Sequence, residues 1–282
     1  MITRRQLLRR VLRTGGVLTG ILGLPAAYGI WEASQIRITR ATVSVPNLPD
    51  PFVGKTIAVL ADLHHGRWVS LSFIKEAVEV AKSLSPDLFA LVGDFAHRGL
   101  RTHEELPPCL DVLSALQAPL GVYAVPGNHD MQNGGRVYRE CIARTPLIDL
   151  TNRHHRITVD GADLWLIGVD DFWYGEPDQD TALKGVPTGA AVVMLCHNPD
   201  YLEAFPDERV GLALCGHTHG GQVYLPVVGS PWIPSMYGEK YRNGLVQGPA
   251  SQVYVSRGLG EAGYPIRIRV PPEINVLTLQ AG

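Results

Sequence analysis

Short apolar runs alternate with amphipathic segments along the first half of the chain. Residues 55–61 and 88–92 have the length and composition of buried strands, and residues 71–84 place apolar side chains at helical spacing between them. Two βα units are therefore expected, and the pattern repeats a third time. The elements expected in this repeat are a helix at 104–116, a strand at 121–125 and a helix near 137–143. An α/β fold is predicted for this half.

Strand patterns dominate beyond residue 150, which indicates a mixed or antiparallel sheet. The strands are expected at 156–159, 164–169, 191–196, 211–215, 222–225, 252–256 and 274–279. The chain has no Ser/Gly-rich linker, charge run or internal repeat that would divide it. We therefore expect one domain over residues 32–282 behind an N-terminal segment, residues 1–31.

The N-terminal segment has the pattern of an export signal. Five arginines fall within residues 4–13, and the apolar stretch 14–31 follows them. Residues 3–9, Thr-Arg-Arg-Gln-Leu-Leu-Arg, resemble the twin-arginine consensus, which predicts use of the twin-arginine export machinery. An ordinary signal or an uncleaved anchor is the alternative, and residues 11–31 are expected to associate with the membrane. Either reading places the domain in the periplasm or on the outer face of the membrane or cell wall.

Composition excludes some functions. The chain has 25 Lys and Arg against 27 Asp and Glu, a net charge of −2, and without the five N-terminal arginines the balance is 20 − 27 = −7. A nucleic-acid partner is not expected, because such a partner needs a strongly basic surface. The four cysteines form no CxxC pair and are interpreted as small buried hydrophobic residues.

Polar residues that commonly bind metals stand directly after five of the expected strands. In open α/β sheets ligands bind outside the carboxyl ends of the strands, so these five loops are expected to converge on one site. The residues that follow the strands are Asp62 and His64; Asp94; Asn128, His129 and Asp130; His197; and His217 and His219.

The donor set indicates two metal ions. Two Asp, one Asn and four His side chains supply seven oxygen or nitrogen donors, which is too many for one tetrahedral zinc. If one Asp bridges, seven residues provide eight bonds, four to each ion. Imidazole with carboxylate suits Mn, Fe or Zn. Two divalent cations held by two carboxylates leave a positive site, which predicts a phosphate ester as substrate.

The five blocks resemble the signature of the calcineurin-like metallophosphoesterase superfamily, which is D-x-H, G-D, G-N-H-[DE], H and G-H-x-H in this order. Residues 62–66, 216–223 and 256–260 are also similar to a bacterial branch of membrane-associated and cell-wall phosphoesterases. The resemblance covers residues 50–280. It implies a four-layer α/β/β/α sandwich, in which two mixed sheets pack face to face with helices outside.

The resemblance also implies a role for each residue. Asp62, His64 and His219 would hold one metal, and Asn128, His197 and His217 the other, with Asp94 as the bridge. A water activated by the metals would attack phosphorus in line. His129 would protonate the leaving oxygen or stabilise the transition state, and Asp130 would bond the other ring nitrogen to orient it.

Other polar residues are less informative. Arg98 and Arg257 are candidates for substrate phosphate, because Arg suits bidentate recognition. Five further histidines match no ligand position in the signature. They are His65, His97, His103, His154 and His155. Two of them, His65 and His97, adjoin ligands and could support those ligands.

The substrate follows less directly from the sequence. Residues 225–241 form an apolar loop with aromatic side chains, which favours a lipid-linked phosphodiester. Simple packing against the sheet is the alternative for this loop, and cell-wall polymers, nucleotides or scavenged phosphoesters are alternative substrates. We predict a phosphodiesterase acting on a membrane-lipid or cell-envelope phosphoester. The alternatives are a phosphomonoesterase for small or protein phosphates and a non-catalytic metal-binding module of the envelope.

Overall fold

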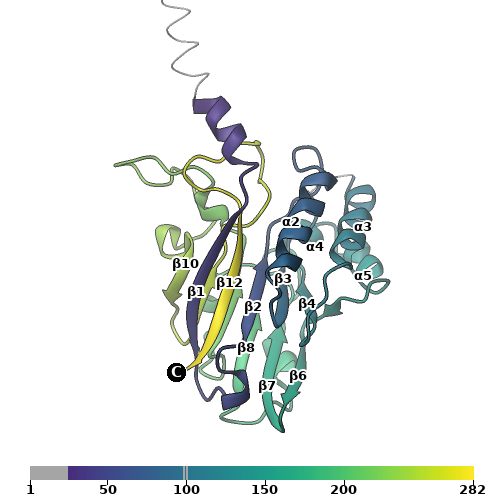
Figure 1. Ribbon diagram of the computed structural model, residues 1–282, viewed down its shortest axis with the longest axis vertical. Coiled ribbons are helices and arrows are strands. Elements are labelled where there is room, and N and C mark those ends of the chain that lie inside the picture. The colour runs from purple at the N-terminus through teal and green to yellow at the C-terminus, as the bar shows by residue number, and fades with distance from the viewer. Residues whose placement is uncertain (1–24, 98, 100) are drawn as a thin grey trace, which may run out of the picture.

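Two six-stranded β-sheets lie face to face in the computed structural model, which describes residues 25–97, 99 and 101–282 (Figure 1). The first sheet has the order β1-β12-β2-β3-β4-β5. Strands β2 to β5 are parallel, whereas β12 pairs antiparallel with β2 and parallel with β1. The bounds are β1 Arg37–Val45, β2 Thr56–Leu60, β3 Leu88–Val92, β4 Val122–Val125, β5 Ile148–Asp149 and β12 Glu273–Ala281.

The second sheet has the order β10-β11-β9-β8-β7-β6 and is mixed, as predicted. Strands β7, β8, β9 and β11 are parallel, and antiparallel β10 and β6 form its edges. The bounds are β6 Arg153–Val159, β7 Ala162–Gly168, β8 Ala191–Leu195, β9 Leu212–Cys215, β10 Gly244–Gln247 and β11 Gln252–Val255.

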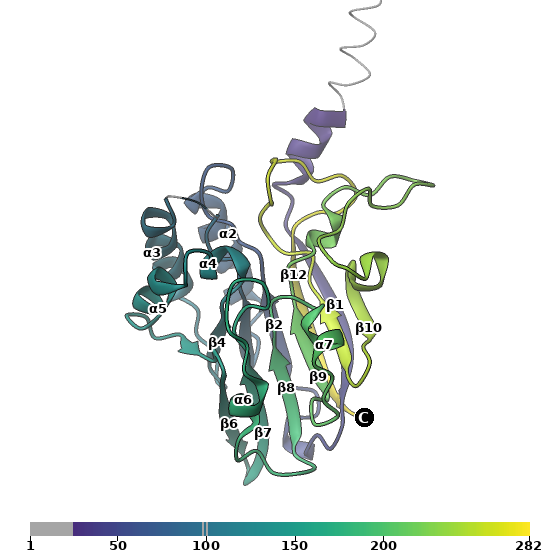
Figure 2. The same ribbon diagram turned by 180° about the vertical axis from the view of Figure 1, so that it is seen from behind.

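Helices cover the outer face of each sheet, which confirms the predicted four layers (Figure 2). Helices α2, α3 and α5 lie on the first sheet, and the short helices α6 and α7 lie on the second. The bounds of the α-helices are α2 Leu71–Ser83, α3 Thr102–Leu113, α4 Asn128–Met131, α5 Arg136–Ile142, α6 Gln179–Leu183 and α7 Tyr201–Ala204, and the 3₁₀ turns are η1 Asp50–Phe52, η2 His219–Gly221 and η3 Gly238–Tyr241.

Side-chain alternation explains why the central strands are apolar without interruption. In β2, Ile57 and Val59 face the second sheet, whereas Ala58 and Leu60 face the helices. Both faces of such a strand are buried, so every position favours an apolar residue. This burial also fixes the position of the strands, and therefore of the polar loops that follow them.

The expected set of strands needs correction. The strand expected at 222–225 is absent: Val223 and Leu225 make only isolated bridges, because left-handed backbone at Gln222 and a tight return from Leu225 to Gly229 prevent an extended run. Strands β5 and β10 were not expected, and neither was β1. The burial of β1 alternates along an edge of the sheet, so this strand lacks the continuous apolar pattern of the central strands.

Residues 25–32 are helical and pack against the domain. The Arg267 amide donates to the Gly29 carbonyl at 3.0 Å, and Gly29 lies against Ile266. The part of the N-terminal segment that the structure describes therefore contacts the loop before β12. Within residues 25–97, 99 and 101–282, no helix combines the length and apolar character needed to cross a bilayer. The twin-arginine motif lies outside the described residues, and the four cysteines are free.

Candidate metal centre

The five polar loops meet at one edge of the sandwich. Strands β2, β3 and β4 of the first sheet and β8 and β9 of the second deliver them, because parallel strands present their carboxyl ends together. All seven expected ligands are buried there, at 5% exposure or less. The structure thus brings together residues that lie far apart in sequence.

Local backbone geometry turns several ligands toward the centre. The left-handed region is occupied by Asp62 (φ 53°), His64 (φ 48°), Asp94 (φ 56°), His217 (φ 71°) and His219 (φ 52°). Non-glycine residues adopt this region at a cost of about 1–3 kcal/mol each, and such strain is concentrated at functional sites. The fold therefore holds these turns for the position of the side chains rather than for local stability.

One group of donors consists of Asp62, His64 and His219. The two imidazole Nε2 atoms are 3.0 Å apart, and His219 Nε2 lies 3.5 Å from Asp62 Oδ1. Burial lowers the pKa of both histidines well below the usual value, so both rings are neutral at neutral pH. Neutral imidazole is the form that binds metal ions.

The second group consists of Asn128, His197 and His217. Asn128 Oδ1 lies 2.8 Å from His217 Nδ1 and 3.2 Å from His197 Nε2. His197 Nδ1 is 2.7 Å from the Val92 carbonyl, which fixes the ring so that Nε2 faces the centre. Burial lowers the pKa of His217 to about 3.

Asp94 lies between the two groups. Its Oδ2 is 3.3 Å from His197 Nε2 and 3.4 Å from His64 Nε2, while Oδ1 accepts a hydrogen bond from the His129 amide at 2.8 Å. Burial alone would raise the pKa of Asp94, but His197 and His129 hold it well below the usual value. The carboxylate is therefore ionised and faces donors of both groups.

The residues fit divalent metal ions. Potential metal ligands converge within 4.8 Å in the groups Asp62, His64, His219 and Asp62, Asp94, His197. The Nε2 atoms of His64 and His219 face each other and the carboxylates of Asp94 and Asp62, and His217 Nε2 has no hydrogen-bond partner among the described residues. Buried nitrogen and oxygen lone pairs that face one another are stabilised when a cation binds between them. Nitrogen and oxygen donors without sulfur suit Mn, Fe or Zn.

His129 and His97 stand beside this centre. His129 is 8% exposed on helix α4, and its ring centroid lies 4.4 Å from that of His64 and 5.5 Å from that of His97. One ring nitrogen from each of His64, His97 and His129 falls within 4.8 Å of the other two. His97 matched no ligand position in the sequence, and its place three residues after Asp94 in the same loop was the available signal.

The Asp130 carboxylate joins two of the loops. It accepts hydrogen bonds from the amides of Phe95 (3.0 Å), Ala96 (3.4 Å) and Gly127 (2.9 Å). Burial raises its pKa to about 8. These contacts fix the backbone on which His129 stands, and the predicted bond to the His129 ring remains a prediction.

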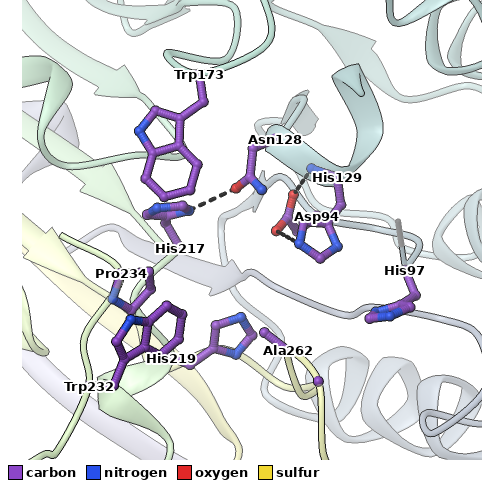
Figure 3. A pocket seen from close by; sticks show the side chains of 11 residues that line it. Asp94, His97, Asn128, His129, Trp173, His217, His219, Trp232, Pro234 and Ala262 are labelled. Atoms are coloured by element: carbon purple, nitrogen blue, oxygen red, sulfur yellow. Dashed lines mark hydrogen bonds and ion pairs between the residues drawn. The ribbon is translucent and has the colours of Figure 1, made fainter. Parts of the chain in front are cut away.

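A cavity of about 250 Å³ opens onto the centre (Figure 3). Its metal side is lined by Asp94, His97, Asn128, His129, His217 and His219, and its outer side by Trp173, Trp232, Pro234, Ala262 and Gly263. The Trp173 ring stands edge-on to His217, with centroids 4.3 Å apart. The Asp171 carboxylate positions it by accepting from the amides of Trp173 and Tyr174. Trp232 belongs to the apolar loop 225–241 that the sequence indicated, whereas Trp173 was not expected at the site.

Of the two candidate substrate arginines, Arg257 does not line the cavity. Arg98 lies outside the described residues. The Arg257 guanidinium contacts the Glu273 carboxylate and, at 3.2 Å, the Thr39 hydroxyl. These contacts link β1 and β12 to the loop after β11, so a role for Arg257 in substrate binding stays a prediction.

Arg267 supports the centre and was missed by the sequence analysis. Its fully buried guanidinium donates to the carbonyls of Val270, Arg257, Gly258 and Gly260. The Gly260 amide in turn donates to the Asp62 carbonyl at 2.6 Å. One buried cation thus holds the loop that packs against the first metal ligand.

Comparison with known proteins agrees with this geometry. Residues 55–221 match the model of the calcineurin-like phosphoesterase family, more than half of the chain. The chain belongs to the calcineurin-like phosphoesterase family. It is a metal-dependent phosphoester hydrolase, because the family's chemistry and the clustered His and Asp donors coincide in one site.

Two bacterial members of the family are similar over most of their length. The chain is 30% identical to the uncharacterized metallophosphoesterase YkuE of Bacillus subtilis, over 99% of this chain and 98% of that protein. It is 33% identical to the phosphodiesterase YaeI of Escherichia coli, over 79% of this chain and 81% of that protein. Among solved structures, Haemophilus influenzae NAD nucleotidase has a TM-score of 0.48 and 16% identity over 73% of this chain and 45% of that chain.

Proposed function

We propose that this phosphoesterase is a binuclear metal-dependent phosphodiesterase that acts outside the cytoplasm on a membrane-lipid or cell-envelope phosphoester. The position of Asp94 supports the proposal that the centre holds two metal ions. One oxygen of this carboxylate lies within 3.4 Å of a ring nitrogen from each of the two donor groups. A carboxylate so placed suits a bridge between two cations.

The chain's own residues would divide the work around the phosphorus atom. When bound, two divalent ions would supply an activated water and neutralise charge on the phosphoryl oxygens. His129 stands at the cavity edge, where its ring is placed to donate a proton to the leaving oxygen. Trp173 and Trp232 form the opposite wall, where they would orient the organic part of the substrate and exclude water.

The cavity supports a diester more than a monoester. No described residue of its lining is Lys or Arg. Lys and Arg side chains stabilise a monoester, which carries two negative charges, more than a diester, which carries one. A described lining without Lys or Arg therefore favours the diester. The name of the relative YaeI, phosphodiesterase, agrees with this choice.

Metal analysis combined with two chromogenic substrates tests the proposal. The purified protein should contain about two metal ions per chain and, with added Mn, should hydrolyse bis-p-nitrophenyl phosphate. His129→Ala should retain its metals but lose most of this hydrolysis. Cleavage of p-nitrophenyl phosphate alone would establish the monoesterase, and one metal per chain would overturn the binuclear site.

Export is tested separately. The signal-like residues 1–31 support a location outside the cytoplasm. Arg4→Lys combined with Arg5→Lys should leave the precursor in the cytoplasm if the twin-arginine route is used. Unchanged export of the double variant would refute that route, and a cytoplasmic wild type would refute the location.

A further inference from the structure

Four segments without any charged side chain line the metal cavity or a second groove that shares the loop before β12 with it. They are residues 25–31, 68–74, 225–238 and 262–266, in a chain of which 18% is charged. Figures 1 and 2 show the N-terminal helix, the loop after β9 and the loop before β12 together at one end of the molecule. We call these four segments the apolar rim.

The rim exposes large apolar side chains to solvent. Val227 is fully exposed and Met236 is 87% exposed. The exposed large residues of the rim are Tyr28, Ile30, Trp31, Trp68, Leu225, Val227, Val228, Trp232, Met236, Tyr237 and Tyr264. Soluble proteins rarely expose apolar side chains in such a concentration unless the surface binds something.

Hydrogen bonds with Asp200 and Gln222 hold the rim in this outward position. The Asp200 carboxylate, 2% exposed, accepts from the Ser235 hydroxyl at 2.5 Å and from the Met236 amide at 2.7 Å. The Gln222 amide group donates to the carbonyls of Tyr264 (2.8 Å) and Ile266 (3.0 Å). The loops are thus tied to the domain through their backbones, which leaves their apolar side chains free.

The rim is continuous with the cavity. Trp232 and Ala262 line the cavity itself. On the other side of the loop before β12, a groove is lined by Ile30, Trp68 and Pro265, among others. A partner that covers residues 225–238 and 262–266 would therefore lie at the opening of the metal cavity.

Charge and residue type indicate the partner. Exposed arginines flank the rim at positions 37, 67 and 269, and the Arg67 guanidinium lies 4.6 Å from the Trp68 ring centroid. Of the nearby carboxyl groups, Glu32 and Glu261 are buried, at 7% and 5% exposure, and the exposed Glu239 pairs with Arg242 at 2.8 Å. Trp and Tyr beside Arg suit the interface of an anionic bilayer, where rings enter the headgroup layer and cations meet lipid phosphates.

We infer that the apolar rim docks on the surface of a lipid bilayer, with the cavity mouth facing the headgroups. Shallow insertion of side chains from irregular loops leaves their backbone groups in the hydrated headgroup layer, so no unpaired backbone enters hydrocarbon. If the proposed function holds, the phosphodiester of a lipid headgroup enters the cavity from this surface.

Labels on the full-length protein test the docking without using catalysis. In a Cys141→Ser background, an environment-sensitive fluorophore is attached to Met236→Cys or Tyr264→Cys. The matched control is Val53→Cys, which is 48% exposed beside the end of β12 that lies opposite the cavity. With vesicles of phosphatidylcholine and phosphatidylglycerol, both rim labels should shift to the blue and be quenched by brominated lipids, whereas the control label should do neither.

Other outcomes overturn the proposal. Rim labels that stay in water on vesicle-bound protein would show that only the N-terminal segment holds the membrane. A blue shift that rises with protein concentration without vesicles would assign the rim to a second copy of the chain.

A loop variant adds a second test. Val227→Asn with Val228→Ser, which lie outside the cavity lining, should weaken bromolipid quenching of the Tyr264→Cys label about tenfold. Hydrolysis of soluble bis-p-nitrophenyl phosphate should not change. If the rim labels insert but the protein does not hydrolyse the diester, the proposed diesterase is refuted and the docking is not. If the loop variant leaves the quenching unchanged, the docking surface is refuted.

Discussion

Replacing Gly127 with Ala should disrupt the metal centre through a single methyl group. Gly127 has φ −108°, a conformation that Ala adopts freely, so the substitution introduces no backbone strain. An added Cβ would lie 2.5 Å from the Asp94 amide nitrogen and 2.8 Å from Asp94 Cγ, against 3.4–4 Å for ordinary contacts. Relief of this overlap requires Asp94 to move by about 1 Å.

The expected effects follow from the position of Asp94. Overpacking of a buried contact costs about 1–3 kcal/mol of stability. A displacement of about 1 Å at a catalytic group costs roughly 100-fold in rate. Since Asp94 faces both donor groups, Gly127→Ala should lose metal from both of them and should lose kcat/KM by about this factor.

Three measurements on one preparation check this prediction: metal per chain by elemental analysis, kcat/KM for bis-p-nitrophenyl phosphate, and the free energy of unfolding in urea. Gly248→Ala is the control, because its added Cβ meets its nearest neighbours at 3.0 Å in the turn between β10 and β11, far from the metals. Gly127→Ala protein with wild-type metal content and turnover would refute the steric argument.

Three further substitutions give distinct signatures. Asp94→Asn should release both metals in elemental analysis, because one charge serves both groups; retention of two refutes the bridge. Arg267→Met should lower the unfolding free energy in urea by about 3–5 kcal/mol, since four carbonyls lose a buried donor; an unchanged midpoint contradicts this. Burial raises the pKa of Glu261 from 4.5 to about 7, so the stability from this group is present below pH 4.5 and is lost as pH rises through 7. Glu261→Gln should therefore gain up to about 3 kcal/mol over wild type between pH 4.5 and 8; a pH-independent difference excludes this.

The central strands and the ligands could be predicted because their constraints are local. Strand β2 is apolar from Ile57 to Leu60 because both of its faces are buried there, and Asp62 comes two residues after its end. Strand β1 escaped prediction because half of it faces solvent and its pattern depends on pairing with β12. The sequence could place Asp94 at a strand end, but its position between the donor groups follows from the packing of two sheets.

The outer half of the site could not be predicted from local patterns. Trp173 reaches His217 because a buried carboxylate two residues earlier holds its amide, and nothing in the spacing indicates that contact. Arg267 looks like any loop arginine until the four carbonyls that it binds are brought together by the fold. Such residues are defined by long-range contacts rather than by neighbours in sequence.

The pairing of β12 between β1 and β2 also constrains how the molecule is made. Among the described strands, β12 is the one sheet neighbour of β1, and the Thr39 hydroxyl donates to the Glu273 carboxylate across 234 residues of sequence. During synthesis, β1 therefore has no sheet partner until β12 leaves the ribosome. Closing a loop of this length is slow relative to local pairing. The edge of β1 is thus exposed to other chains throughout translation, and a chaperone bound there would protect the nascent chain from aggregation.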